Sequence, residues 1–543
     1  MIYIMMLMFS LITMIYSMMM IMNNKFIIIK MSIMNLMTFN LSIDMMLDWI
    51  SILFMTIVLL ISSMIIMYSM YYIPKNQQKY FIILLLMFVL SMMILILSNN
   101  MFLLLLGWDG LGMSSYILVI YYQNYLTASC GSITILTNRL GDILMLLSMS
   151  MLLISSNWML SMNKNMSLIT MTLLVLAACS KSAQFPFSAW LPMAMAAPTP
   201  ISALVHSSTL VTAGVYLMIR LSSTIHYSSM IILMIISTAT ALYSSMSANW
   251  EQDLKKIIAL STLSQIAMMM FAISLNSIML AYLHLIIHAI FKSTMFLCAG
   301  IMIHESSYQD MRMMGMNFKN NPITMNIMGL TSMALMGIPF MSGFFSKDAI
   351  IEMMIVSKMN LIMSFMMIMS IGMTASYSLR MSFSSTKSLI KSNTLLFNHT
   401  NMSCLFPLML LAPLAIMSGS FMTWILNSEQ MFMMSQEQKF IILLSLSLGL
   451  MLGSLLSFKN SKYMKIGLKS MLMWFIHPLS TIILMMKPIM NIFSKNDNQW
   501  QEMYGPTNSF LLLKLSSKFP EMYKYYLMLT LVMMMMIPII IMT

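Results

Sequence analysis

Charged side chains are scarce in this chain. Only 8% of its 543 residues are Asp, Glu, Lys or Arg, whereas 60% are hydrophobic; soluble domains usually contain about 25% charged residues. The composition excludes an ordinary soluble protein and indicates an all-α polytopic membrane protein. We count about fifteen apolar stretches of the length that a transmembrane helix needs, and they lack the alternation of barrel strands. Residues 23–48 are more polar and are expected to lie outside the hydrocarbon.

Cysteine is also scarce, and its spacing is uninformative. The four cysteines, Cys130, Cys179, Cys298 and Cys404, are far apart, and the chain has no CxxC pair and no GxGxxG after a strand. These are the patterns expected for iron–sulfur, zinc and dinucleotide sites. We therefore expect no cofactor in this chain. If the protein works in redox metabolism, other chains hold the cofactors.

The few charges present are unbalanced. The net charge of +13 arises from 28 Lys and Arg against 15 Asp and Glu. Lysines of connecting segments, such as Lys75, Lys79 and Lys459, can contact anionic headgroups. We expect lipids such as cardiolipin, and not nucleic acid, as partners of these charges.

Methionine is very abundant. The chain has 82 Met residues, in loops as well as in apolar runs, although Met as a soft core filler would be needed only inside. A genetic code that reads AUA as Met in an AT-rich genome explains this excess. The composition favours an animal mitochondrial gene.

An apolar stretch over residues 277–304 contains three titratable side chains. His284, His288 and Lys292 are four residues apart, so on a helix they form one polar stripe. Each ionised group in lipid would cost about 2.5 to 3.5 kcal/mol, so the stripe must face a bundle interior or a wet cavity. We interpret it as part of a proton path. The two histidines also have zinc-ligand spacing, but the sequence shows no nearby third ligand.

Other charged residues occur within apolar stretches. Asp109 lies near the middle of a predicted span over residues 101–122, where Gly107, Gly110 and Gly112 let neighbouring helices approach closely. In the next span, Arg139 and Asp142 are three residues apart and can pair. We interpret that pair as structural.

Two stretches are interrupted, and each has a lysine at the break. Pro186, Pro192, Pro198 and Pro200 follow Lys181 and precede His206, so that no continuous helix can form there.

The second interruption has a similar composition. Gly337, Pro339 and Gly343 precede Lys347 and Asp348. Paired broken helices of this kind are typical of transporters built from inverted repeats.

This pattern gives a domain division along the chain. We expect N-terminal transmembrane helices (1–98), a first antiporter-like repeat (99–250), a second repeat (251–385), further transmembrane helices (386–469), a lateral amphipathic segment (470–524) and a final transmembrane anchor (525–543).

Six motifs between residues 47 and 385 resemble those of one family. They are LLGWDGLG, NRLGD, KSAQFPFSAWLPMAMAAPTPISALVHSSTLVTAGVYL, DLKKIIALSTLSQ, HLIIHAIFKSTMFLCAG and GIPFMSGFFSKDAIIE. Their order resembles that of chain 5 of NADH:ubiquinone oxidoreductase, respiratory complex I, and the core also resembles that of multi-subunit sodium/proton antiporters. Asp109 departs from the pattern, because many members have Glu there.

The resemblance implies a function. It implies a membrane-arm subunit in the mitochondrial inner membrane that translocates protons and adjoins other antiporter-like subunits. NADH, FMN, iron–sulfur clusters and ubiquinone would then belong to partner subunits. Two alternatives stay open: a sodium/proton antiporter subunit without redox coupling, and a structural anchor whose charges are idle.

Eight residues form the relay that we expect: Asp109, Lys181, His206, His284, His288, Lys292, Lys347 and Asp348. A carboxylate near a buried lysine stabilises its charged form. Asp109 would therefore control whether Lys181 holds or releases its proton. The histidines would carry the proton through water, because either protonation state of histidine is accessible near neutral pH. The last lysine, modulated by its neighbouring aspartate, would hold the proton before exit.

Overall fold

The computed structural model describes most of the chain. The described residues are 2–36, 39–154, 158–159, 166–314, 321–357, 361–387, 402–426, 436–456, 487–496, 508–511, 514 and 530. The chain divides into two units, Met1–Met471 and Leu472–Thr543, and each is described by itself.

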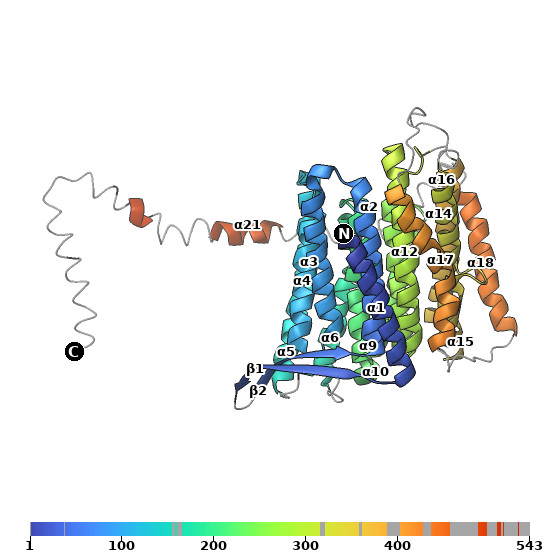
Figure 1. Cartoon of the computed structure of the whole chain (residues 1–543). Coiled ribbons are helices and arrows are strands. Elements are labelled where there is room, and N and C mark those ends of the chain that lie inside the picture. The colour runs from blue at the N-terminus through green and yellow to red at the C-terminus, as the bar shows by residue number, and fades with distance from the viewer. Residues whose placement is uncertain are drawn as a thin grey trace. The chain divides into compact units, whose positions relative to one another are not determined.

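The first unit is a bundle of helices that run side by side (Figure 1). The long helices are α1 (Ile2–Asn23), α2 (Trp49–Tyr72), α3 (Gln78–Leu97), α4 (Met101–Val119), α5 (Tyr125–Ile154), α10 (Tyr227–Ala248), α11 (Leu254–Ser274), α12 (Ile278–Ser306), α16 (Leu361–Lys387), α17 (Met402–Leu426) and α18 (Gln436–Leu456). In the described ranges, 11 helices are long and apolar enough to cross a membrane: the ten from α1 to α17 in this list and the segment Thr199–Thr224, whereas the apolar part of α18 is shorter. The predicted class, an all-α polytopic membrane protein, is confirmed.

The predicted total of about fifteen spans stays a prediction. Three shorter apolar helices accompany the 11 long ones, and the expected terminal anchor over 525–543 lies outside the described residues except for Thr530. In the second unit the structure describes two helical pieces of the expected lateral segment, α21 (Lys487–Lys495) and residues 508–511. The other residues of that segment are largely outside the described ranges.

A β-hairpin is the one departure from helical structure that the sequence analysis missed. Strands β1 (Ile27–Leu36) and β2 (Phe39–Leu47) pair antiparallel, and the hairpin lies across one end of the bundle (Figure 1). The Asp44 side chain is buried, and the Asn99 amide donates to the Asp44 carbonyl at 2.9 Å. The hairpin thus packs on the turn that joins α3 to α4.

A charged contact fixes the start of α2 to the end of α9 (Leu210–Leu221). The Arg220 guanidinium lies 2.7 Å from the Asp48 carboxylate, and both side chains are largely buried. Arg220 Nε also donates to the Tyr216 hydroxyl at 2.9 Å, and that hydroxyl donates to the Ile96 carbonyl at 2.7 Å. Three helices are therefore joined at the same end of the bundle.

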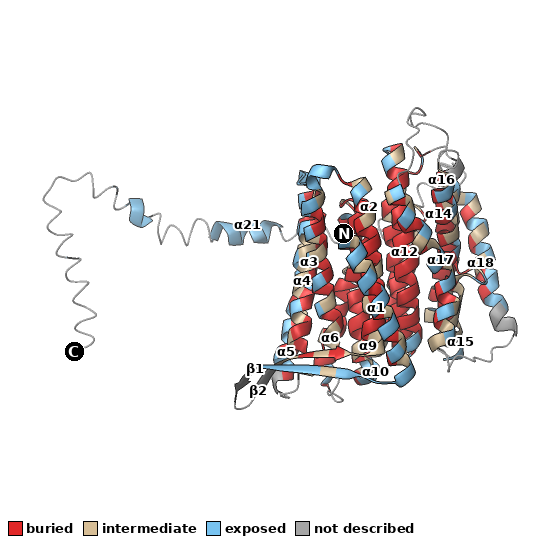
Figure 2. Cartoon of the chain, in the orientation of Figure 1, coloured by how far each residue is buried: buried red, intermediate tan, exposed pale blue. Residues whose placement is uncertain are grey.

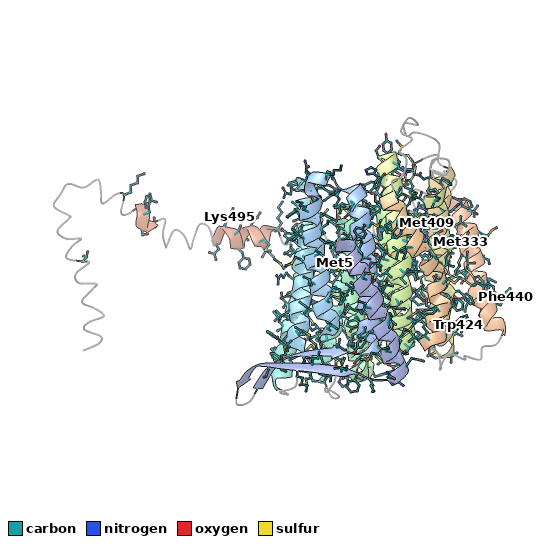
Figure 3. All side chains as sticks on the ribbon, viewed as in Figure 1. Met5, Met333, Met409, Trp424, Phe440 and Lys495 are labelled. Atoms are coloured by element: carbon teal, nitrogen blue, oxygen red, sulfur yellow. The ribbon has the colours of Figure 1, made fainter. Side chains whose placement is uncertain are left out.

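Burial is greatest at the centre of the first unit. The apolar segments of helices α11 and α12 are buried throughout. Helix α12 is red along most of its length in Figure 2. Large apolar side chains cover the outside, among them Met5, Met333, Met409, Trp424 and Phe440, which Figure 3 labels. The buried charged side chains lie within this largely hydrophobic core, away from the apolar exterior, as a bilayer requires.

Glycines bring α3 and α4 close together, as predicted. A Cβ added to Gly107 would lie 2.7 Å from the backbone nitrogen of Leu95, and one added to Gly110 would lie 3.0 Å from the Ser91 Cβ. A larger residue at position 107 would push the two helices apart.

We expect Tyr216→Phe to lower the unfolding temperature of the solubilised protein. The change leaves the Ile96 carbonyl without its donor, a loss of about 1 to 3 kcal/mol for a buried group. Reaction of the buried thiols of Cys179 and Cys298 with a fluorescent maleimide reports unfolding. The control is Tyr227→Phe, because that side chain is 80% exposed. Equal unfolding temperatures for the two variants would contradict the role given to Tyr216.

Candidate functional site

The first predicted interruption is present. Helix α6 (Leu168–Lys181) ends at Lys181, and only two short helices, α7 (Trp190–Ala194) and α8 (Thr199–Ile201), precede a π-helical turn, η2 (Ser202–Thr209). The prolines between them prevent a regular α-helix. The turn η2 continues into α9, so Lys181 and His206 lie on either side of the break.

The second interruption separates α14 (Pro322–Met336) from α15 (Ser342–Val356). Gly337 has φ of +83°, a left-handed conformation that glycine adopts without strain and that commonly ends helices. Lys347 lies in α15, and its Nζ donates to the Met336 carbonyl at 3.3 Å. The lysine therefore binds a carbonyl that the interruption leaves free of helical partners.

Lys181 is completely buried and bound by neutral groups. Its Nζ donates to the Trp108 carbonyl at 3.2 Å and lies 5.2 Å from the centre of the Trp108 ring. Gly112 on α4 leaves room for the lysine side chain, because a Cβ at this position would lie 3.3 Å from the lysine nitrogen. The α4 backbone thus forms one wall of the Lys181 site.

The carboxylates near Lys181 differ from the expected pair. In the described part of the chain Lys181 makes no ion pair within 4 Å, so Asp109 is a nearby charge and not a direct partner. Asp142 and Asp109 are both near enough to act on the lysine electrostatically. Trp108 connects Lys181 and Asp142, because its Nε1 donates to Asp142 Oδ1 at 2.9 Å.

Asp142 is the functional candidate that sequence reasoning missed. Its predicted pair with Arg139 is confirmed, with 3.6 Å between Nη1 and Oδ2. In the sequence, the nearby Arg139 is a sufficient partner for the Asp142 charge. Nothing in the sequence indicates that Asp142 also accepts a hydrogen bond from Trp108. The two acids, Arg139 and Asn138 line a small hollow next to Lys181. The Arg139 side chain is 49% exposed, whereas the Asp142 side chain is 8% exposed.

His206 lies farther inside, on η2. It is 1% exposed, and neither ring nitrogen has a hydrogen-bond partner among the described residues. The turn η2 packs against α12, the helix that carries the histidine stripe, and the His206 ring lies 6.2 Å from the Trp190 ring.

The stripe on α12 is buried in the bundle, as predicted. His284 Nδ1 lies 2.8 Å from Ser346 Oγ, and His284 Nε2 lies 3.1 Å from Gln265 Oε1. The His284 and His288 rings are 6.2 Å apart, and Lys292 Nζ donates to Ser261 Oγ. The nitrogens of His288 are buried with no described partner.

Lys347 completes this group of titratable side chains. Its Nζ donates to Thr374 Oγ1 at 2.7 Å, and the neighbouring Asp348 acts on it electrostatically. Lys347 acts electrostatically on both His284 and Lys292. The structure therefore brings His284, His288, Lys292 and Lys347 into one cluster, whose members cannot all be charged at little cost.

The structure assembles no described metal site. Within the described ranges, no three His, Cys, Asp or Glu side chains come together in a way that would hold a metal ion. His284 and His288 have the spacing of zinc ligands, but no third ligand lies beside them among the described residues.

The segment before α11 needs a correction. The sequence predicts a surface turn around Asp253, Lys255 and Lys256, and Asp253 and Lys256 do form a partly exposed ion pair of 2.9 Å. Lys255 instead is 4% exposed, and its Nζ donates to the Ala197 carbonyl at 3.1 Å. This lysine turns inward because the interrupted helix offers a free carbonyl there.

Three family models match the chain. The model described as NADH:quinone oxidoreductase/Mrp antiporter, transmembrane, matches residues 98–374; the complex I chain 5 N-terminus matches 33–81; the NADH dehydrogenase subunit 5 C-terminus matches 377–543. NADH-ubiquinone oxidoreductase chain 5 of Lumbricus terrestris is 40% identical over 74% of this chain and 73% of its own length. The chain belongs to the NADH-ubiquinone oxidoreductase chain 5 family.

Further comparisons agree with this assignment. Chain 5 of Anopheles gambiae is 38% identical over 76% of this chain and 74% of its own length. Among solved structures, a chain of the Mrp complex from Dietzia sp. has a TM-score of 0.71 at 21% identity, over 95% of this chain and 57% of that chain. This likeness supports the fold.

We expect Asp142→Asn to reduce proton transfer through the Lys181 site. The amide keeps an oxygen that can accept from Trp108, but it removes the charge that stabilises the Lys181 ammonium. The measurement is the number of protons moved per NADH oxidised by the complete reconstituted complex.

The matched control is Asp310→Asn, since this residue lies in a connection outside the spans and pairs locally with Arg312 at 2.6 Å. An unchanged proton number in the Asp142 variant would assign that residue a structural role only.

Proposed function

We propose that this chain is a proton-translocating membrane subunit of respiratory NADH:ubiquinone oxidoreductase, located in the mitochondrial inner membrane. The observation that carries the proposal is a row of buried lysines and histidines through the centre of an apolar bundle. Electron transfer from NADH to ubiquinone, with its FMN and iron–sulfur clusters, belongs in this proposal to partner subunits. Other antiporter-like subunits adjoin this chain, and cardiolipin contacts its basic connections.

Lys181 is the first store of the proton. Asp109 and Asp142 lie between it and the hollow, so they favour its ammonium form. Any movement that draws the carboxylates away from Lys181 destabilises the ammonium in its apolar site. The proton then leaves for the interior.

The histidines carry the proton across the middle of the bundle. His206 and His288 have ring nitrogens with no described partner, and a buried polar group of this kind is normally satisfied by water. Water between them would form the connecting chain. Histidine suits the task because it can accept at one ring nitrogen and donate from the other.

The two lysines beyond the histidines exchange the proton. Lys292 and Lys347 are buried and repel one another when both are charged. Arrival of a proton at Lys292 therefore favours release of the proton that Lys347 holds, and Lys347 can then accept the next one. Asp348 stabilises the charged form of Lys347 and makes it the store before exit.

A sodium/proton antiporter subunit is the alternative with the same fold. The Mrp neighbour supports that fold, but the relatives that are 38–51% identical carry the name of the oxidoreductase chain. Co-purification distinguishes the two functions, because only the oxidoreductase subunit would remain with flavin- and iron–sulfur-containing proteins.

We expect Lys347→Met to lower the number of protons moved per NADH oxidised. Methionine fills the same buried volume but cannot hold a proton, so the path from Lys292 to the exit is cut. The measurement uses the complete complex in liposomes, with NADH oxidation and internal pH followed together. Lys79→Met, at an exposed lysine, is the control. A normal ratio in the Lys347 variant would favour the structural-anchor alternative.

A further inference from the structure

The hairpin at one end of the bundle (Figure 1) carries a buried carboxylate. Asp44 on β2 is 0% exposed. In the described part of the chain, neither oxygen of this carboxylate has a hydrogen-bond partner, and Asp44 makes no ion pair within 4 Å. A buried carboxylate is costly when nothing compensates its charge, because water no longer stabilises it. Some other group must therefore do so.

A second polar side chain is buried at the same place. Met45 and Ser98 form an antiparallel bridge, and the Asn99 N–H donates to the Asp44 carbonyl at 2.9 Å. Asp44 and Asn99 therefore lie opposite one another across this bridge. Opposed residues of an antiparallel pair point to the same face, with Cβ atoms about 4.5 to 5.5 Å apart. Asn99 is also 0% exposed, and neither Oδ1 nor Nδ2 of its side chain has a hydrogen-bond partner among the described residues.

The described cations near this place are engaged elsewhere. Lys30 is the cross-strand partner of Asp44 in the hairpin, but it is exposed, and its Nζ lies 3.9 Å from Met159 Sδ. Arg220, at the same end of the bundle, pairs with Asp48 at 2.7 Å. Within the described ranges, the charge of Asp44 therefore has no counter-ion from the protein.

We propose that Asp44 and Asn99 bind a small monovalent cation, of which sodium is the probe, beneath the hairpin. The ligands are both carboxylate oxygens of Asp44 and the amide oxygen of Asn99, with water in the remaining positions. Oxygen donors of this kind suit hard cations and not soft metals such as Cu(I). A single positive charge neutralises the one carboxylate, whereas a divalent ion would leave a net charge in buried surroundings.

The separation of the two side chains fits a shared cation. Two oxygens that bind the same cation lie farther apart than two atoms that share a hydrogen bond. The Asn99 amide accordingly stands opposite the Asp44 carboxylate and does not donate to it. A bound cation would attract both groups, and its charge would be compensated by Asp44.

The cation would hold the hairpin on the bundle. Asp44 belongs to β2 and Asn99 to the turn between α3 and α4, so the two ligands come together only while the hairpin is packed on that turn. A ligand that binds only the packed form makes opening rarer by a factor of one plus the ratio of its concentration to its dissociation constant. This site is separate from the proton relay and goes beyond the proposed function.

The test is hydrogen–deuterium exchange of the complete complex, followed by mass spectrometry of peptides from the hairpin. Samples contain sodium chloride or N-methylglucamine chloride at equal ionic strength, so that screening is the same in both. We expect the amides of Phe39–Leu47 to exchange about tenfold more slowly when the sodium concentration is about ten times the dissociation constant. Peptides over residues 307–312, in a connection remote in sequence from the hairpin, should exchange equally in the two salts.

Three variants identify the ligands. Asp44→Asn keeps the shape of the side chain and removes its charge, so we expect hairpin exchange to become independent of sodium. Asn99→Ala keeps the carboxylate and removes one ligand, so the sodium concentration for half the effect should rise several-fold. This variant also tests the site if Asp44→Asn does not assemble. Lys30→Met should respond to sodium as the native protein does.

Three outcomes would overturn the site. Native hairpin exchange that is equal in the two salts would mean that a proton or a cation of the chain itself neutralises Asp44. A sodium response that is unchanged in Asp44→Asn or in Asn99→Ala would place the cation elsewhere. A response that appears only in Lys30→Met would identify Lys30 as the counter-ion. None of these results depends on the proton yield of the Lys347 variant, so the two proposals fail separately.

Discussion

Buried lysines without carboxylate partners are the feature on which this structure depends. The ammonium groups of Lys181, Lys255, Lys292 and Lys347 donate to backbone carbonyls or hydroxyl groups. Hydrogen bonds of this kind compensate only part of the cost of taking a charge out of water, whereas a full ion pair would fix the charged form. A lysine bound in this way therefore keeps a smaller preference for its charged form than a lysine in water does. The rest of the bundle supplies the apolar surroundings that have this effect.

The interrupted helices serve this constraint directly. A regular helix uses its carbonyls internally, and only its last turn leaves them free. The break after α14 offers the Met336 carbonyl to Lys347, and the break before η2 offers the Ala197 carbonyl to Lys255. Proline and glycine therefore do more than bend the chain. They free backbone carbonyls that accept hydrogen bonds from lysine side chains inside the membrane, where water is scarce.

Features set by spacing along one helix could be predicted from the sequence, whereas contacts between helices could not. The i, i+4 spacing of the α12 stripe and the proline pattern after Lys181 were sufficient to place the interruptions and the buried face. The hydrogen bonds of Asp142 to Trp108 and of Gln265 to His284 join residues 34 and 19 positions apart, and no local pattern encodes them. The hairpin over residues 27–47 lies within the more polar segment 23–48, whose mixed composition indicates a position outside the hydrocarbon but no particular secondary structure.

The distribution of acidic groups along the row has a physical reason. Asp109 and Asp142 line the hollow beside Lys181, where their charges can stabilise the ammonium without forming an ion pair with it. Around His284 the described contacts are a hydroxyl and an amide, both neutral. A carboxylate at that place would pair with the nearest protonated group and hold it, or would carry protons whenever a gradient existed. Neutral partners avoid both outcomes, so the interior can stay closed until the charges around it change.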